Sequence, residues 1–160
     1  RTSMIVGFPG ETDADFAELS QFVEAAKFDR LGVFSYSDED TSESFKLDGK
    51  VDARTIYNRK RKLMSLQKKI SRAKNRTLVG SEFRVLVEGP TEESELVWQA
   101  RLSTQAPDID GVCYISDPGE QPLQAGEIRT MRIVKAHDYE LTGELIDEPV
   151  RPRERLFQIA

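Results

Sequence analysis

Hydrophobic positions divide the chain into two halves with different periodicities. In the first half, a short apolar run over residues 3–8 precedes an amphipathic stretch over 13–26 and a second apolar run over 31–36. Apolar runs without strict alternation indicate strands buried in a parallel sheet, and apolar residues at helical spacing indicate a helix packed through one face. Residues 3–36 are therefore predicted to form one right-handed strand–helix–strand unit with parallel strands, a piece of an α/β barrel or sheet.

The predicted helix over 13–26 has clear boundary signals. Thr12 can accept a hydrogen bond from the backbone three residues on while Asp15 returns one, which makes a capping box with Asp in place of Glu. The preceding Gly7-Phe8-Pro9-Gly10 predicts a tight turn, where glycine backbone and free helix N–H groups suit a bound ligand. A plain strand-to-helix turn is the alternative. The predicted apolar face of the helix contains Phe16, Leu19, Phe22, Val23 and Ala26.

A polar loop over 37–50 and a long helix over about 52–75 complete the first half. Apolar residues of this helix recur about every seven residues, so it should pack through one narrow stripe and solvate the rest. The stripe is predicted to contain Ile56, Leu63, Leu66, Ile70 and Ala73.

The second half consists of short β-branched and aromatic runs separated by turn signals. Five short strands at this spacing predict a small closed antiparallel barrel, which leaves no open sheet edge. The expected domains are residues 1–75, residues 76–147 and an irregular tail over 148–160. The strands are predicted over 82–88, 96–102, 111–116, 128–139 and 141–145, with turns at 89–90, 106–107, 117–119 and 125–126.

Charge reverses between the two halves. Residues 50–76 hold eleven Lys or Arg and one acid, whereas residues 77–147 hold five Lys or Arg and fourteen acids, a net charge of −9. The basic helix could neutralise nucleic-acid phosphates, or it could be a solvated outer face. The acidic barrel should repel a phosphate backbone and attract a protein rich in Lys and Arg.

Composition narrows the classes of function. The chain is 38% hydrophobic and 32% charged, the balance of a soluble globular protein. No apolar run approaches the roughly 20 residues that a membrane span needs, so we expect a cytoplasmic protein without a membrane partner. The single cysteine, Cys113, excludes a disulfide within the chain and an all-cysteine metal site. We interpret it as a small buried hydrophobe, His137 as a surface residue and Trp98 as core packing.

Three consecutive acids, Asp38, Glu39 and Asp40, follow the second predicted strand. Carboxylates suit Mg²⁺ or Ca²⁺, but this spacing matches no calcium loop, so a solvated loop is the favoured interpretation.

Several segments together resemble a known family. Val6–Thr12 (VGFPGET) and Gly32–Thr41 (GVFSYSDEDT) resemble late barrel strands of the radical S-adenosylmethionine methylthiotransferases, and the acidic half resembles their TRAM domain, an OB-like β-barrel. Gln105–Val112 (QAPDIDGV) and Asp138–Glu144 (DYELTGE) are similar to the branch that modifies a ribosomal protein, RimO. The tRNA-modifying branch usually has Pro-Arg-Pro-Gly-Thr after its Tyr-Ser, which this chain lacks. The resemblance covers about residues 2–146.

The resemblance implies an enzyme with S-adenosylmethionine and two four-iron four-sulfur clusters. Such an enzyme replaces a C–H bond with C–SCH3 at the β-carbon of an aspartate in the twelfth small-subunit ribosomal protein, a basic partner. It also implies that residues 1–75 are part of a TIM-like barrel whose remainder lies upstream. Because the six cluster cysteines are absent and the chain enters a strand directly at Arg1, we expect a piece of a longer protein that is inactive alone.

The resemblance also implies roles for individual residues. Ile5 would touch the adenine of S-adenosylmethionine, Ser3 would face its ribose, and Gly7 would permit close approach. No catalytic residue and no metal ligand are expected in this chain. The substrate side would be lined by residues of the loop after the second strand: Tyr36, Ser37, Glu39 and Thr41.

Two other functions fit the same residues. In the first, the enzyme class is kept but tRNA is the substrate, and the basic helix makes the contact, so that neutralising it would flatten the salt dependence of binding. A weak contact with tRNA or ribosomal RNA is also compatible with the hypothesis that the substrate is a ribosomal protein. In the second, the chain is a non-enzymatic adaptor built on a β-barrel.

Overall fold

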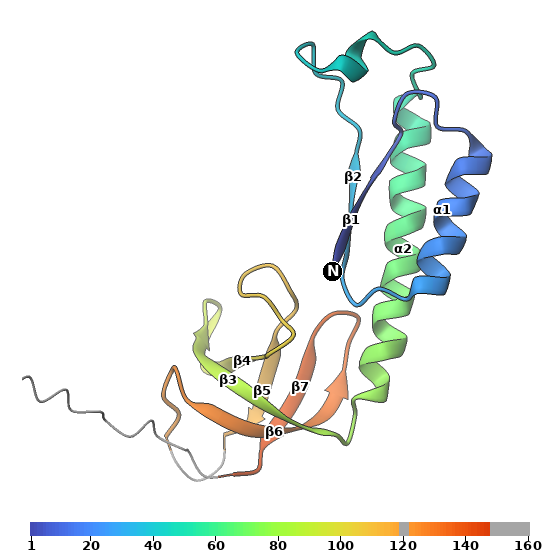
Figure 1. The fold of residues 1–160 in the computed structure, drawn as a ribbon. Coiled ribbons are helices and arrows are strands. Elements are labelled where there is room, and N and C mark those ends of the chain that lie inside the picture. Colours follow the sequence, from blue (N-terminus) through green and yellow to red (C-terminus); the bar gives the residue numbers. More distant parts are fainter. Residues whose placement is uncertain (119–121, 148–160) are drawn as a thin grey trace, which may run out of the picture. The chain divides into compact units, whose positions relative to one another are not determined.

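The computed structural model describes residues 1–118 and 122–147. They form two compact units, the first from Arg1 to Lys74 and the second beginning at Asn75. The first unit contains two strands and two long helices, and the second contains five strands (Figure 1). Among the described residues, no helix is long and apolar enough to cross a bilayer. The elements of the first unit are β1 (Thr2–Val6), α1 (Asp13–Ala26), β2 (Leu31–Ser35), the 3-10 turn η1 (Glu43–Lys46) and α2 (Ala53–Thr77), whose last three residues belong to the second unit.

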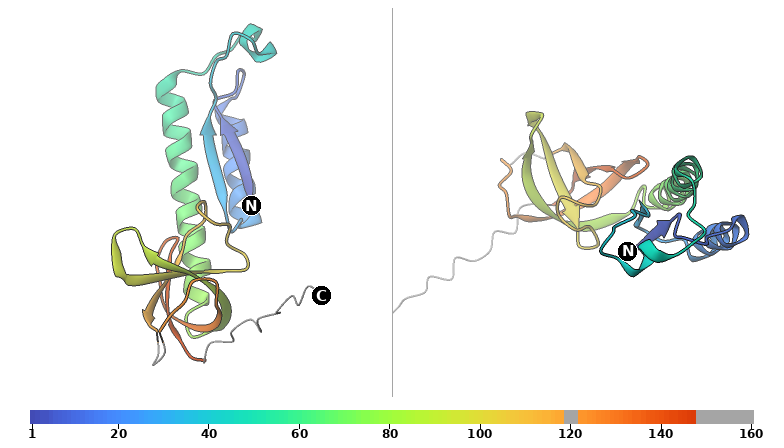
Figure 2. Two further views of the ribbon diagram at one scale, coloured as in Figure 1. Left: turned by 90° about the vertical axis from the view of Figure 1, so that its left-hand side faces the viewer. Right: turned by 90° about the horizontal axis from the view of Figure 1, so that it is seen from above.

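The first unit is the predicted strand–helix–strand unit with an additional helix. β1 and β2 pair in parallel, with Thr2 opposite Leu31 and Val6 opposite Ser35. Both long helices lie on the same side of this two-stranded sheet (Figures 1 and 2). The parallel pairing confirms the prediction. The buried core between the sheet and the helices consists of Val6, Val23, Leu31, Val33 and Leu63.

The other face of the sheet is uncovered within the described residues. Ile5 is 58% exposed and Phe34 is 56% exposed. The prediction of strands buried on both faces is therefore wrong for this structure, because α1 and α2 cover only one face.

The boundaries of α1 follow the sequence signals. The Asp15 amide donates to Thr12 Oγ1 at 3.2 Å and the Thr12 amide donates to Asp15 Oδ2 at 2.8 Å, which confirms the capping box. The predicted apolar face is too wide, however, since Phe22 is 52% exposed and Ala26 is also exposed. Only one stripe of α1 contacts the core, and Phe22 instead packs edge-on against the ring of Phe28.

Helix α2 buries polar as well as apolar residues. Its amino end is capped by Asp52, whose carboxylate accepts from the Thr55 amide at 3.0 Å. The predicted stripe is partly correct, because Leu63 is buried and Ile56, Leu66 and Ile70 pack beside it, whereas Ala73 is exposed. Four-residue spacing places a row of mainly polar residues on the buried side: Arg59, Leu63, Gln67, Ser71 and Asn75.

The second unit is a closed barrel with the strand order β3-β4-β5-β7-β6. The prediction of a closed barrel is confirmed, but the prediction that all strands are antiparallel is wrong. A closed ring with an odd number of strands cannot alternate in direction throughout, and here β5 and β7 pair in parallel. The strands are β3 (Glu82–Thr91), β4 (Ser94–Leu102), β5 (Cys113–Asp117), β6 (Ile128–Ala136) and β7 (Leu141–Leu145).

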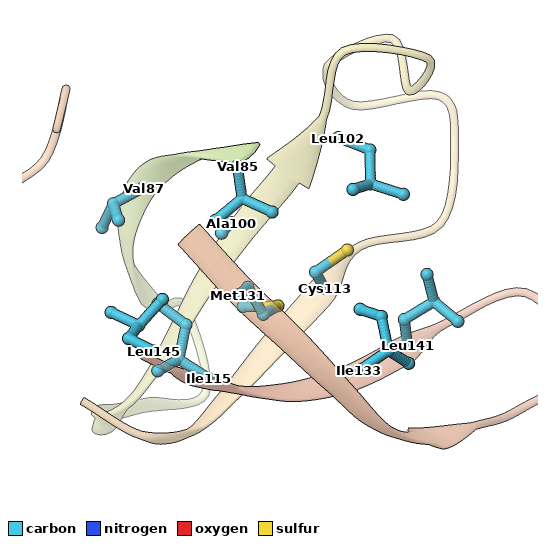
Figure 3. Packing of buried hydrophobic residues seen from close by; sticks show 10 residues of the cluster. All are labelled: Val85, Val87, Ala100, Leu102, Cys113, Ile115, Met131, Ile133, Leu141 and Leu145. Atoms are coloured by element: carbon cyan, nitrogen blue, oxygen red, sulfur yellow. The ribbon is translucent and has the colours of Figure 1, made fainter. Parts of the chain in front are cut away.

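The barrel core is apolar and well buried (Figure 3). Cys113 is fully buried within it, as predicted, and Trp98 packs against it from the margin. His137 is exposed, which confirms its interpretation as a surface residue. The core residues are Val85, Val87, Ala100, Leu102, Cys113, Ile115, Met131, Ile133, Leu141 and Leu145.

Two predicted boundaries in the barrel are wrong. Gly89-Pro90 is not a turn, since it lies inside β3, where the pairing register with β4 shifts and Gly89 has a φ of +136°. Glycine supplies the positive φ that some β-bulges need, and a bulge locally bends a strand. The hairpin turn comes later, at residues 92–93. The strand predicted over 128–139 ends at Ala136. The predicted tail over 148–160 and Gly119 lie outside the described residues.

Candidate functional site

The uncovered face of the β1–β2 sheet carries two of the residues predicted to meet a cofactor. Ser3 lies opposite Gly32 and Ile5 lies opposite Phe34 in the parallel register, and both Ser3 and Ile5 are exposed. A Cβ at Gly32 would stand 3.3 Å from the Phe34 ring, so glycine leaves room there. The face therefore combines two large apolar side chains with one hydroxyl, a composition suited to a flat, partly polar ligand.

Gly7 lies immediately after β1 and is buried. Its φ is +83°, and an added Cβ would stand 2.3 Å from Ile56 Cγ1 of α2. The positive φ of the turn favours glycine at this position, and the close packing of α2 leaves no room for a side chain. The space that a side chain would occupy is thus filled by Ile56, not left open toward a ligand.

A partly buried ion-pair network that the sequence did not indicate connects the turn after β1 to α2. Arg59 of α2 donates to Glu11 Oε1 at 2.6 Å and to the Glu11 carbonyl at 3.1 Å. It also donates to Asp13 Oδ1 at 2.7 Å. Although burial disfavours the charge, these bonds to Asp13 and Glu11 raise the pKa of the Arg59 guanidinium. Glu11 in turn accepts from the Gly7 amide at 3.0 Å, so the network links the turn to α2.

The loop after β2 is organised around Tyr36. Its hydroxyl donates to Asp38 Oδ1 at 3.0 Å and is 2.9 Å from Ser44 Oγ, and its ring packs edge-on against Phe8. Lys50 Nζ donates to Asp38 Oδ1 at 2.6 Å and lies 5.6 Å from the Tyr36 ring centre. Hydrogen bonds from Lys50 and Tyr36 hold the pKa of Asp38 below its ordinary value. The carboxylate of Asp38 thus accepts its hydrogen bonds from residues of the same loop.

The remaining residues predicted for the substrate side are solvent-facing. Ser37 Oγ donates to Glu39 Oε1 at 2.8 Å, and Thr41 is exposed. In residues 1–118 and 122–147, no group of three or more His, Cys, Asp or Glu could hold a metal ion. The structure therefore brings Tyr36 together with Asp38, Ser44 and Lys50, while Ser37, Glu39 and Thr41 stay at the surface of the loop.

The barrel surface carries acids in two different settings. Some acids pair with arginines, because Arg132 bonds both Glu82 and Glu144 and Arg101 lies 2.7 Å from Glu88. At the turn between β3 and β4 and in the first residues of β4, by contrast, three exposed acids lie close in sequence to two exposed apolar residues. These residues are Glu92, Glu93, Glu95, Leu96, which is 91% exposed, and Val97, which is 40% exposed.

Comparison with known protein families identifies the family of the second unit. The family model of the TRAM domain matches residues 79–146, which are the residues of the closed barrel. The resemblance noted from the sequence is thereby confirmed for this half of the chain.

Comparison with curated proteins covers both units. The chain is 65% identical to the ribosomal protein uS12 methylthiotransferase RimO of Solibacter usitatus over 95% of the chain and 32% of that protein. The proteins of the same name from Koribacter versatilis and Myxococcus xanthus are 52% and 46% identical over 91% and 97% of the chain. The chain spans about a third of the length of these relatives, between 29% and 32%. Over nearly its whole length it therefore belongs with the carboxyl-terminal part of the RimO methylthiotransferases, and it contains a TRAM domain.

Proposed function

We propose that the whole protein is a ribosomal protein uS12 methylthiotransferase. The observation that carries this proposal is the 65% identity to a protein of that name over 95% of the chain. The implied reaction replaces a C–H bond at the β-carbon of an aspartate in uS12 with C–SCH3. The relatives' names support a protein substrate over the tRNA alternative.

Residues 1–74 are proposed to complete a TIM-like α/β barrel with strands from elsewhere in the protein. The support is physical, because a two-stranded parallel sheet with one uncovered face has unpaired edges and too little core to be stable alone. The exposed Ile5 and Phe34 would then face the barrel interior. Residues 1–74 would thus supply late strands and the outer helices α1 and α2.

S-adenosylmethionine is proposed to bind on this uncovered face. When bound, it would supply the radical that removes hydrogen from the substrate carbon. The apolar side chain of Ile5 suits the adenine ring, and the hydroxyl of Ser3 suits a ribose hydroxyl; both are exposed on one strand. Gly7 would act less directly, because its position next to Ile56 fixes the turn at the end of that strand.

The loop after β2 is proposed to line the substrate side through Tyr36, Ser37, Glu39 and Thr41. Ligands of parallel α/β sheets lie at the carboxyl ends of the strands, and this loop starts at the carboxyl end of β2. The bonds of Tyr36 to Asp38 and Ser44 would hold the loop in one conformation.

The iron–sulfur clusters are proposed to be held outside this chain. Clusters of this kind need several thiolates, and the chain has one cysteine, which is buried in the barrel. Residues 1–160 alone should therefore be inactive. A cytoplasmic location is proposed on the basis of the ribosomal substrate.

The TRAM domain is proposed to dock uS12. Residues 77–147 carry a net charge of −9, which suits a basic ribosomal protein. Exposed acids give specificity and speed of association more than raw affinity, so their effect should depend on salt.

Charge reversal on the barrel tests this docking role. Replacing Glu92, Glu93 and Glu95 with Lys in the full-length protein should weaken uS12 binding at low salt and have less effect at high salt. The same number of reversals at Glu18, Glu24 and Asp48 of the first unit, which are also exposed, is the matched control. Equal losses in both variants, or no loss in the first, would exclude the barrel as the docking surface.

A further inference from the structure

The outer face of α2 is strongly and uniformly basic. The helix has 25 residues, ten of them Lys or Arg and none acidic. Arg59 forms ion pairs with Glu11 and Asp13, and Lys74 forms one with Asp29, all acids of the same unit. The face turned away from the buried row is therefore rich in positive charge without acids of its own helix.

Five of the exposed cations of α2 form two neighbouring rows. Arg54, Arg61 and Lys68 are spaced seven residues apart, as are Lys62 and Lys69, and all five are exposed. Residues seven apart on a helix lie within about 20° of the same direction. Arg54 and Lys68 are about 21 Å apart along the axis at the rise of an α-helix, a length that reaches several phosphates of a nucleic-acid duplex.

An aromatic side chain lies on the same face. Tyr57 is 62% exposed, and the guanidinium of Arg61 lies 5.9 Å from its ring centre. Exposed aromatic rings and arginine planes are surfaces on which unpaired RNA bases stack. A merely solvated outer face has no need of an exposed ring beside its cations.

A membrane surface fits this face less well than RNA. Helices that lie in a bilayer interface insert an apolar face between the lipids. The apolar residues of α2, including Ile56, Leu63 and Ile70, are instead packed in the core of the first unit. The basic face of α2 therefore has no apolar stripe beside it that could insert into a bilayer.

We propose that this face of α2 docks on the phosphate backbone of small-subunit ribosomal RNA. A ribosomal protein in an assembling subunit is surrounded by RNA, so a cationic helix would orient the enzyme while the acidic barrel holds the protein substrate. The identification of ribosomal RNA as the source rests on the proposed function, whereas the RNA-binding face itself does not.

The test is a salt titration of the full-length protein with purified small-subunit ribosomal RNA, with bulk tRNA and with polyglutamate. The variant Arg61→Gln, Lys62→Gln, Lys69→Gln removes three exposed cations of α2. Binding to ribosomal RNA should weaken roughly 10-fold or more at low salt, and the slope of log K against log salt should fall by about two to three.

The matched control removes three exposed cations outside α2, through Lys46→Gln, Arg84→Gln and Lys135→Gln. It changes the net charge equally and should alter binding less than about twofold if the α2 face makes the contact. Circular dichroism of both variants establishes that helix content is kept.

Four results would overturn the proposal. Equal losses of RNA affinity in the two variants would mean that net charge, and not the α2 face, determines binding. Unchanged RNA affinity of the α2 variant would mean that this face does not bind RNA. Polyglutamate competing as well as RNA would identify an anion-binding face for acidic proteins. If tRNA binds as tightly and with the same loss, the ribosomal source is wrong. Binding of isolated uS12 is measured separately, so failure of the proposed function and failure of this proposal are distinguishable.

Discussion

Replacing Arg59 should release the turn after β1, because this side chain is the main link between that turn and α2. Arg59 is 6% exposed, and its guanidinium makes ion pairs of 2.6 Å with Glu11 and 2.7 Å with Asp13. Arg59→Met keeps a long apolar side chain in the same space while removing every bond that the guanidinium donates. The turn should then open more often.

The two ion pairs should contribute very differently. The Glu11 side chain is 12% exposed, whereas the Asp13 side chain is 98% exposed. Leaving one partner of a buried pair unpaired costs about 3 to 5 kcal/mol, and losing an exposed pair costs about 0.2 to 1 kcal/mol. Arg59→Met should therefore cost about 3 kcal/mol, while Asp13→Asn should cost less than about 1 kcal/mol.

The double variant Arg59→Met, Glu11→Gln separates the pair from the uncompensated charge. Since it leaves no buried ion behind, it should recover a large part of the loss caused by Arg59→Met alone. Such non-additivity is expected for residues in one network.

Hydrogen exchange of the full-length protein measures these costs locally, because local opening has its own free energy in a protein with several domains. Amides of the turn and of the first part of α1 should exchange about 100-fold faster in Arg59→Met, since each 1.4 kcal/mol is tenfold. Equal small changes in Arg59→Met and Asp13→Asn would refute the reasoning. A double variant that is worse than Arg59→Met would also refute it.

Three further changes test other parts of the structure. Gly7→Ala should destabilise the first unit by about 1 to 3 kcal/mol in thermal unfolding, since its Cβ would meet Ile56 at 2.3 Å. Adding Ile56→Ala should remove the steric clash but not the backbone strain, because φ at residue 7 stays at +83°. Thr12→Ala removes the cap of α1 and should cost about 1 kcal/mol, with Thr12→Ser nearly neutral. Burial raises the pKa of Asp147, but hydrogen bonds from Thr130 outweigh it and hold that pKa below 3.8. The stabilisation by Asp147 is thus full above about pH 4 and lost as the pH falls through the folded-state pKa, so Asp147→Asn should flatten the acid limb of the stability curve.

Local sequence signals accounted for most of the secondary structure. The capping box at Thr12 and Asp15 placed the start of α1 correctly, because it depends only on residues three apart. The parallel pairing of β1 with β2 followed from the intervening helix. The closed barrel followed from the number and spacing of short strands, but its one parallel pair depends on how the ring closes, which no local pattern encodes.

Long-range packing accounts for what the sequence did not predict. Arg59, Gln67 and Ser71 have the composition of a solvated helix face, yet they are buried because their partners come from distant segments. Gln67 donates to the carbonyl of Phe28, thirty-nine residues away in sequence. The bulge at Gly89 was predicted as a turn, because glycine and proline favour both and only the pairing with β4 distinguishes them.

The candidate site was predicted from family resemblance more than from residue patterns. Ser3 and Ile5 share an exposed face, as a cofactor surface requires, but that face is recognised only once the helices are placed on the opposite side. The role of Gly7 in packing against Ile56 had no signal in the sequence, since glycine in a turn suggests backbone freedom alone.

The central claim is tested most directly by incubating the purified full-length protein, with its clusters reconstituted, with S-adenosylmethionine, a sulfur source, a reductant and either uS12 or tRNA. Peptide mass spectrometry should find one methylthio group on an aspartate of uS12 and none on the nucleosides of tRNA. A methylthio group on tRNA with unmodified uS12 would contradict the account and favour the tRNA-modifying alternative.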